Sequence, residues 1–286
     1  MAFRQCGIVG LGLLGGSLAL DLRAAFPEME IIGVARRAET TRRAAAMHSG
    51  GMPVFTTLSH DLSVLQKTEL IFLCTPVQTI IQQLAELANI VAPGTIITDV
   101  GSTKRMVMNA AVAALPATIT FIGGHPMAGR EQSGLEAAVV GLYTNATWAL
   151  CVPAGAEAAG DNLAALITAI GACPHRIDAQ THDEIVARTS HLPHVVAAAL
   201  ANAVLGRNFD AVAQQFIAGG FRDTTRVAAG VPDMWRDILL TNRDQVLPAL
   251  DDLLSELNNW REAVRTGDAP YLEALLTTAQ QRREKV

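Results

Sequence analysis

Two side chains suited to proton transfer, Ser102 and His125, each follow a short apolar run of the sequence, residues 94–99 and 120–123. An imidazole has a pKa near neutrality, so it can accept a proton from a hydroxyl group at working pH. His125 stands between glycines and a proline, and we expect it on a loop and not in a core. A single loop histidine is more often structural, but a histidine and a serine at neighbouring strand ends indicate a reactive site.

A glycine-rich turn of the pattern G-x-G-x-x-G follows the apolar residues 3–9 and opens a helical stretch; it comprises Gly10, Leu11, Gly12, Leu13, Leu14 and Gly15. In this setting Gly10 permits a tight turn, Gly12 lets a pyrophosphate approach the backbone, and Gly15 lets helix and strand pack closely. The helix N-terminus offers N–H groups to phosphate oxygens. The turn therefore predicts a dinucleotide site, the alternative being a glycine turn that binds no ligand.

The end of the second apolar run, residues 30–35, predicts which dinucleotide binds. An acidic side chain about 20 residues beyond the glycines would bond the ribose hydroxyl of NAD. Ala35 stands there instead, and Arg36 and Arg37 follow it. Guanidinium groups bind phosphate well, so we expect these residues at the adenosine end of NADP, with NAD possible. Alternatively, the two arginines only begin an exposed helix.

Residues that directly follow two further apolar runs should also line the cofactor cleft, because the carboxyl ends of parallel strands face the ligand in this architecture. They are Cys74, Thr75 and Pro76, and farther along the chain Asp99 and Ser102. For the first three, a proline turn that merely ends a strand is the alternative.

These motifs need a scaffold that brings strand ends to one edge, and residues 1–152 supply it. Short apolar runs alternate there with helical stretches; the expected strands are residues 3–9, 30–35, 70–74, 94–99, 120–123 and 147–152. Such alternation predicts an α/β fold with a doubly wound, mainly parallel sheet of the Rossmann type.

Residues 153–286 are expected to form an all-α domain, with one more strand near residues 174–177. Pro193 offers no N–H to the carbonyl of Thr189, which predicts a kink in its helix. Helices with apolar faces on two sides often pack across a two-fold axis. We therefore expect a homodimer formed through this domain.

Composition argues against several other classes of protein. The 286 residues carry a net charge of −5 and no basic tract, so we expect no nucleic-acid partner. The longest apolar stretch, residues 195–205, is shorter than the roughly 20 residues that span a bilayer, so we expect no membrane segment. No zinc-ligand or redox spacing joins the cysteines, which predicts no metal site and reduced thiols in the cytoplasm; they are Cys6, Cys74, Cys151 and Cys173.

Four motifs in this order resemble the signature of the prephenate/arogenate dehydrogenase family. They are Asp-Val-Gly-Ser-x-Lys at 99–104, Gly-His-Pro-Met-Ala-Gly at 124–129, Ser-His-Leu-Pro-His at 190–194 and Gly-Phe-Arg-Asp-Thr-Thr-Arg at 220–226. Several motifs in one order are more specific than any motif alone. The resemblance implies a Rossmann domain joined to an all-α dimerisation domain, as in 6-phosphogluconate-dehydrogenase-like enzymes.

The resemblance also implies an oxidative decarboxylation in tyrosine biosynthesis, of arogenate to tyrosine or of prephenate to 4-hydroxyphenylpyruvate. Hydride leaves the hydroxyl-bearing ring carbon for the nicotinamide, carbon dioxide is lost, and the ring becomes aromatic. His125 would accept the proton of the ring hydroxyl, and Ser102 would orient both His125 and that hydroxyl. NADP use tends to accompany arogenate use in this family, which favours arogenate.

By the same resemblance, five residues of this chain would bind the substrate. Arg226 would hold the ring carboxylate, and Asp223 would orient Arg226 or pair across the dimer. His194 would help to form the side-chain pocket, and Trp235 would reach into the partner's active site. Arg130 stands where the family often has a small or hydroxylated residue, and would contact the side-chain carboxylate or shield the site. A surface ion pair is the alternative for Arg226, and core packing is the alternative for His194 and Trp235.

Two other functions stay open on the sequence. A β-hydroxyacid dehydrogenase or imine reductase also joins a Rossmann domain to helices, but such enzymes usually carry a catalytic lysine on the first C-terminal helix. Residues 183–205 contain no lysine. A non-catalytic NADP sensor would need the glycines and arginines, but not Ser102, His125 and Arg226 together.

Overall fold

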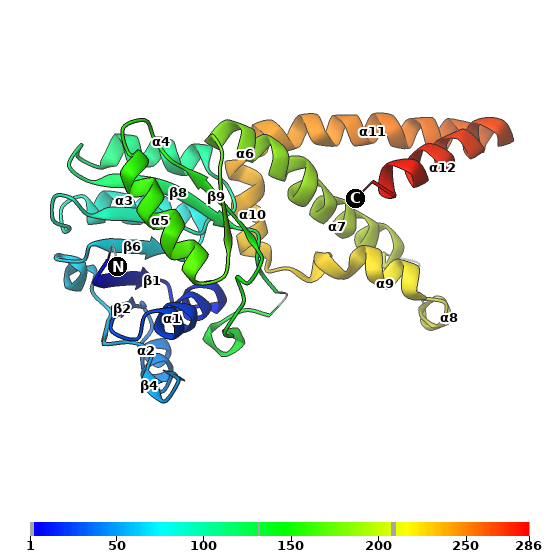
Figure 1. Cartoon of the computed structure of the whole chain (residues 1–286). Coiled ribbons are helices and arrows are strands. Elements are labelled where there is room, and N and C mark those ends of the chain that lie inside the picture. The colour runs from blue at the N-terminus through cyan, green and yellow to red at the C-terminus, as the bar shows by residue number, and fades with distance from the viewer. Residues whose placement is uncertain (1–2, 131, 207–209, 286) are drawn as a thin grey trace.

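An α/β domain is followed by helices that extend away from it to one side (Figure 1). This structure, a computed structural model, describes residues 3–130, 132–206 and 210–285. Its described part holds an eight-stranded sheet with the order β10-β9-β8-β7-β6-β1-β2-β5. The strands are β1 Gln5–Val9, β2 Glu30–Val34, β5 Thr57–Ser59, β6 Leu70–Leu73, β7 Ile96–Asp99, β8 Thr120–Pro126, β9 Thr147–Cys151 and β10 Cys173–Arg176.

The central strands confirm the doubly wound sheet. From β5 through β2, β1, β6 and β7 to β8, every neighbouring pair is parallel. The chain winds outward in both directions from β1 and β6, and the crevice at such a reversal point is where dinucleotides bind in open α/β sheets. A small hairpin of β3 His48–Ser49 and β4 Met52–Pro53 lies outside this sheet.

Helices cover both faces of the sheet, so its strands are apolar on both sides and read as continuous hydrophobic runs. One buried cluster joins Leu18 of α1 and Ile167 of α5 to the sheet, and another joins Leu84 of α3 and Val107 of α4 to it. The helices are α1 Leu13–Ala25, α2 Ala38–Ala45, α3 Val77–Leu87, α4 Arg105–Ala114 and α5 Glu157–Ala169; short 3₁₀ turns, η1 Leu62–Leu65 and η2 Leu135–Ala137, lie in the connections.

The sheet continues beyond the predicted domain boundary at residues 152–153. β9 runs antiparallel to β8, and β10 then pairs parallel with β9. Because α5 and β10 pack on this sheet, the helical domain begins only after them. We propose a boundary at residues 177–178, ahead of α6.

The described residues of the C-terminal part form helices joined by short turns, with no strand among them. Its elements are α6 Ala179–Val186, the π-helical turn η3 Ala187–His191, α7 Leu192–Val204, α8 Ala211–Gln215, α9 Gly219–Thr225, the 3₁₀ turn η4 Arg226–Ala229, α10 Pro232–Thr241, α11 Arg243–Thr266 and α12 Ala269–Arg283. α6 packs against α4, and α10 packs against α3. No described helix is both long and apolar enough to cross a membrane.

Local sequence explains how these helices begin and end. The helix predicted to kink at Pro193 is divided just before that residue by η3, and the proline occupies the first turn of α7, where its missing N–H costs little. α11 ends at Gly267, whose φ of 66° is left-handed and favours glycine. The Asp268 side chain then accepts a hydrogen bond from the Tyr271 N–H at 3.0 Å and starts α12.

Candidate active site

The glycine turn between β1 and α1 has the shape that a pyrophosphate requires. Gly10 has a φ of 96°, and a Cβ there would lie 2.6 Å from the Cys74 carbonyl oxygen. A Cβ on Gly15 would lie 2.0 Å from the Gly10 carbonyl oxygen, whereas a Cβ on Gly12 would meet nothing within 4 Å. The first N–H groups of α1, those of Leu13, Leu14 and Gly15, have no acceptor within the helix. The turn thus leaves open space at Gly12 and donors beside it, which fits a dinucleotide.

A cavity of about 700 Å³ opens beside this turn. It brings together most of the residues predicted at the cofactor, namely Gly10, Leu11, Gly12, Ala35, Arg36, Arg37, Cys74, Thr75 and Pro76. Leu13, Leu14 and Gly15 lie on α1 at its edge. Arg36 and Arg37 are exposed at its rim, and neither forms an ion pair with another described residue. Both guanidinium groups are therefore available to a phosphate.

Two other polar side chains that line the cavity, Arg43 and His60, are already paired. Arg43 lines the cavity and forms ion pairs with Glu39 of its own helix and with Glu136 of η2. A ring nitrogen of His60 lies 2.8 Å from the Ala35 carbonyl oxygen. No carboxylate stands at the position of Ala35, so a ribose hydroxyl finds no acidic partner there.

His125 lies within β8 and not on the loop that the sequence predicted. It stands opposite Ala149 of β9, in a register that also pairs Gly123 with Cys151. The antiparallel partner strand extends β8 past the glycines to Pro126, which the sequence of 120–126 alone does not indicate. The histidine is therefore held by a strand pair at the carboxyl edge of the sheet, with its side chain partly exposed.

A chain of three side chains leads from His125 into the helical domain. Nδ1 of His125 lies 2.9 Å from Nε2 of His182, and Nδ1 of His182 lies 2.8 Å from Oδ1 of Asp183. His182 and Asp183 belong to α6 and are buried. Neither residue is among those predicted from the sequence, although a histidine followed by an aspartate in the first turns of a helix was a usable signal.

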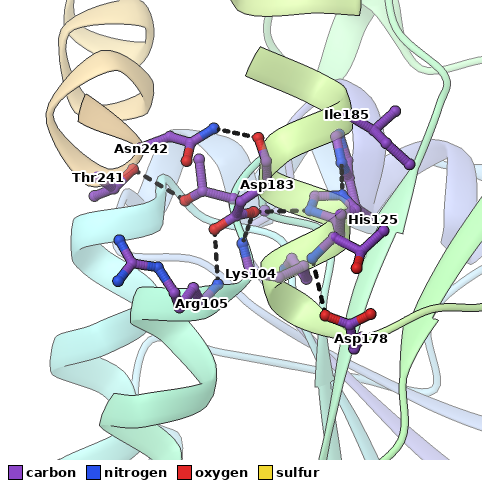
Figure 2. Close-up of polar contacts among 12 residues, drawn as sticks. Lys104, Arg105, His125, Asp178, Asp183, Ile185, Thr241 and Asn242 are labelled. Carbon is purple, nitrogen blue, oxygen red and sulfur yellow. Dashed lines mark hydrogen bonds and ion pairs between the residues drawn. The ribbon is translucent and has the colours of Figure 1, made fainter. Parts of the chain in front are cut away.

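The Asp183 carboxylate lies at the N-terminus of α4. Its Oδ1 accepts a hydrogen bond from the Lys104 backbone N–H at 2.7 Å, and its Oδ2 accepts one from the Arg105 N–H at 2.9 Å (Figure 2). Unpaired N–H groups and the helix dipole favour a negative charge there. The Asn242 side chain donates to the Asp183 backbone carbonyl at 2.8 Å. Asp183 thereby joins the helical part to the α/β domain.

Asp99, predicted to bind the cofactor, is fully buried. Its Oδ1 accepts a hydrogen bond from the Gly124 N–H at 2.9 Å, and its Oδ2 accepts one from the Gly101 N–H at 2.9 Å and is paired with the equally buried Lys104 ammonium. Both carboxylate oxygens are thus engaged inside the protein. Asp99 holds the ends of β7 and β8 together beneath His125, and its side chain does not reach the cleft.

Ser102 stands half-buried in the segment between β7 and α4. Within the described residues no hydrogen bond joins its side chain to His125; the orienting contact predicted for it is made by His182. Its hydroxyl stays a predicted partner of the substrate.

The predicted pocket residues His194 and Trp235 meet within one chain. Their rings are stacked, with centroids 3.5 Å apart and planes 7° from parallel. A Cβ on Gly230 would lie 2.4 Å from Nε1 of Trp235, so only a glycine leaves room for the indole. Trp235, predicted to reach into a partner's site, packs in this structure on α7 of its own chain. Stacking holds it there, together with an edge contact to His191.

The remaining predicted substrate residues are exposed. Arg226 begins η4, which packs on α7, the helix that carries His194. Asp223 lies one turn earlier on α9, and Arg130 lies on the segment after β8. Their contacts with a substrate stay predictions.

Burial keeps the site histidines neutral. It lowers the pKa of His125 well below its ordinary value of 6.5, and the nearby His182 and Lys104 lower it further. Burial likewise lowers the pKa of His191 to about 4, and it lowers the pKa of His194. A neutral imidazole is the form that accepts a proton.

The pH dependence of turnover should report the lowered pKa of His125. Protonation removes the lone pair of the base, so activity is lost as pH falls through this pKa. Because the pKa lies below 6.5, we expect kcat/KM to stay level as pH falls from neutrality to 6.5 and to decline only in more acidic buffer. Initial rates across a pH series, with thermal unfolding recorded at each pH, test this. A midpoint at or above 6.5 would contradict it.

Family models match both parts of the chain, the prephenate dehydrogenase nucleotide-binding domain over residues 18–172 and the prephenate dehydrogenase dimerization domain over residues 178–278. A prephenate dehydrogenase of Bacillus subtilis (strain 168) is 35% identical over 280 residues, which are 97% of this chain and 74% of that protein. A cyclohexadienyl dehydrogenase of Zymomonas mobilis is 32% identical, over 94% of this chain and 92% of that protein.

Solved structures agree in fold over the whole length. The crystal structure of Synechocystis arogenate dehydrogenase has a TM-score of 0.82 and 33% identity, and the match covers 98% of this chain and 99% of that one. Prephenate dehydrogenase from A. aeolicus, in complex with hydroxyphenyl propionate and NAD+, has a TM-score of 0.90 and 27% identity, covering 100% and 99% of the two chains. Because family models match both parts of its sequence and a prephenate dehydrogenase is 35% identical over 97% of it, the chain belongs to the prephenate dehydrogenase family.

Proposed function

We propose that this enzyme oxidatively decarboxylates arogenate to tyrosine, or prephenate to 4-hydroxyphenylpyruvate, with NADP as the preferred hydride acceptor. The observation that carries the proposal is the placement of His125. It stands near the carboxyl end of β8, partly exposed, at the same edge of the sheet as the ends of β1, β2 and β6 that line the cavity, and its Nδ1 is held by His182.

The residues of this chain would divide the chemistry as follows. A dinucleotide held by its pyrophosphate at the glycine turn would supply a nicotinamide as the acceptor of the hydride from the hydroxyl-bearing ring carbon. Nε2 of His125 takes the proton of that hydroxyl as the carbonyl bond forms, and its lowered pKa keeps it unprotonated beforehand. The Ser102 hydroxyl orients the same oxygen. Arg226 holds the ring carboxylate until it departs as carbon dioxide and the ring becomes aromatic.

The choice between the two substrates belongs to the side-chain end of the site. Relatives with arogenate, prephenate and cyclohexadienyl dehydrogenase names all match this chain. His194 with Trp235 would form one wall there, and Arg130 would lie at the entrance. We favour arogenate because the cofactor end of the site suits NADP.

The cofactor preference rests on Ala35, Arg36 and Arg37. A 2′-phosphate carries negative charge and several acceptor oxygens, which two exposed guanidinium groups at the cavity rim can bind. The A. aeolicus structure holds NAD+, so NAD is the alternative that the experiment must include.

Replacing Arg36 and Arg37 together by alanine should raise the KM for NADP by about tenfold or more, since charge-assisted contacts to the phosphate are lost. The KM for NAD, which lacks the phosphate, should stay within about threefold. Initial rates at varied cofactor concentration measure both constants. Arg42→Ala serves as the control, because Arg42 is exposed on α2, the helix that follows the two arginines, and does not line the cavity. Equal changes for both cofactors would overturn the assignment.

We also propose a homodimer formed through the helical domain. α11 exposes apolar side chains at positions spaced by seven and three residues, which places them along one face; they are Leu247, Leu254, Leu257 and Val264. A stripe of this kind on a helix that projects from the α/β domain needs a partner to cover it (Figure 1). The match to a dimerization domain supports a second copy as that partner. The expected cytoplasmic location stays a prediction.

The function is tested by initial rates of the purified protein with NADP, with arogenate and prephenate offered separately, and with both repeated in NAD. Turnover of arogenate with NADP alone supports the whole proposal. Turnover of prephenate keeps the chemistry and changes the substrate. Tight NADP binding without turnover of either compound would overturn the proposed reaction in favour of a cofactor sensor.

A further inference from the structure

We propose that Asp183, acting through His182, fixes His125 in the tautomer whose Nε2 carries a free lone pair. The two α6 residues would be positioning residues, because neither has to touch the substrate. The inference rests on the proposed function only in naming His125 as the proton acceptor; the tautomer itself is a property of the protein.

Both carboxylate oxygens of Asp183 accept hydrogen bonds from backbone N–H groups. A backbone N–H can only donate, so the N–H groups of Lys104 and Arg105 make both carboxylate oxygens acceptors. The carboxylate is fully buried and lies at the N-terminus of α4, a ten-residue helix whose dipole favours the ionised form. Asp183 is therefore an anionic acceptor at the inner end of the chain of side chains.

The acceptor at Asp183 determines which ring nitrogens of His182 and His125 carry a proton. Nδ1 of His182, 2.8 Å from an oxygen that accepts, must carry a proton and donate it. A neutral His182 then has its lone pair on Nε2, 2.9 Å from Nδ1 of His125. His125 must donate from Nδ1, which leaves Nε2 without a proton. A second-shell partner of this kind commonly sets which nitrogen of a histidine reacts.

Nε2 of His125, the nitrogen without a proton, lies on the accessible side of the histidine chain. Nε2 of His125 has no hydrogen-bond partner within the described residues. It is also absent from the set of buried polar atoms without a partner, so the atom is accessible from outside. His125 is partly exposed, whereas His182 is only 2% exposed. The lone pair is thus on the nitrogen that a substrate can reach, and the inner ring is sealed from water that could exchange the protons.

One consequence is that residues of the helical domain fix the tautomer of a histidine in the α/β domain. His125 belongs to β8 of the α/β domain, whereas His182 and Asp183 belong to α6. The same carboxylate fastens α4 to α6. Displacement of α6 from α4 would therefore release the tautomer of His125 together with the packing of the two domains.

The direct test reads the ring protons by nitrogen NMR of protein labelled with ¹⁵N-histidine. The chain has seven histidines, so the His125 signals are assigned as those lost in His125→Asn. In the unaltered protein with NADP bound, at neutral pH, we expect a protonated Nδ1 and a bare Nε2 for His125. A protonated Nε2 would overturn the proposal, whatever the protein's activity.

The variant Asp183→Leu tests the origin of the tautomer. Its apolar side chain offers no acceptor to Nδ1 of His182, so the proton order of the two rings is no longer fixed. We expect both His125 tautomers in the NMR signals and a lower kcat, with KM values within about threefold. Loss of stability with an unchanged His125 tautomer would overturn the proposal, because Asp183 would then act only as a helix anchor.

Thr103→Val is the matched control. Its hydroxyl lies 2.9 Å from that of Thr241 and is buried beside the same helix N-terminus, but it is not part of the histidine chain. We expect this variant to lose stability and to keep both tautomer and kcat. His182→Phe, which keeps a ring and removes its nitrogens, covers the case in which Asp183→Leu does not fold; it should mix the His125 tautomers and lower kcat. A single unchanged tautomer in His182→Phe would overturn the proposal.

These readouts separate the inference from the proposed function. If the unaltered protein turns over neither arogenate nor prephenate, the reaction is wrong, but the NMR signals still decide the tautomer. If turnover is fast while His125 has the opposite tautomer, the reaction stands and the positioning role of Asp183 is wrong.

Discussion

Replacing His125 by asparagine should lower kcat by about 10²- to 10⁴-fold, the range that a positioned proton acceptor contributes. The amide nitrogen of asparagine can still donate to His182, so the buried part of the network keeps its contact. What is lost is Nε2, the nitrogen proposed to accept the proton of the substrate hydroxyl. The KM values for substrate and cofactor should stay within about threefold, since neither depends on this atom for binding.

Steady-state rates and thermal unfolding of the His125→Asn variant measure the effect. His175→Asn provides the control, because His175 lies exposed on β10 of the same sheet and has no place in the proposed chemistry. A kcat within about threefold of the unaltered enzyme would remove His125 from the reaction, given the size expected for acid–base catalysis.

The second large effect is expected for Arg226→Ala. In the proposed reaction Arg226 pairs with the ring carboxylate of the substrate, and truncating one partner of a buried charge pair costs about 2–5 kcal/mol. That energy corresponds to a rise in KM of about 30-fold or more. The melting temperature should change little, because Arg226 is exposed at the start of η4.

Two further variants sharpen the interpretation of Arg226. Arg226→Lys keeps the charge but loses the paired N–H groups that match a carboxylate, so its KM should fall between those of the unaltered and alanine enzymes. Arg222→Ala removes another exposed arginine from α9 and should leave KM unchanged. An unchanged KM in Arg226→Ala would show that another cation binds the carboxylate.

A structural feature could be predicted from the sequence where it depends only on residues close together in the chain. The glycine turn is such a case, because Gly10 needs a left-handed φ and Gly15 needs the absence of a Cβ, and both needs are visible in the spacing. The parallel strands were also predictable, since burial on both faces makes them continuous apolar runs. Ala35 and the arginines after it follow from a fixed distance to that turn, and the cavity brings them together with it.

The features that the sequence missed all depend on a partner distant along the chain. His125 falls in a strand because β9 pairs with it, and no pattern in 120–126 specifies that partner. Asp99 is withdrawn from the cleft by N–H groups of two different segments and by Lys104. The contact from His182 to His125 spans 57 positions. Contacts of that kind follow from the packing of α6 on α4, which the composition of either helix alone does not predict.

The π-helical turn η3 makes chain length part of the active site. Each residue of an α-helix advances the direction of the next side chain by about 100°, so a turn with one residue more than an α-helical turn changes the direction of everything beyond it. His194 follows η3, and its stacking on Trp235 depends on the angle at which α7 leaves that turn. With the same residues wound as an α-helix, every side chain beyond η3 would turn by about 100°, and the His194 ring would leave its stack on Trp235. The extra residue that the π-helical turn accommodates thus sets the direction of the wall proposed for the substrate pocket without being part of it.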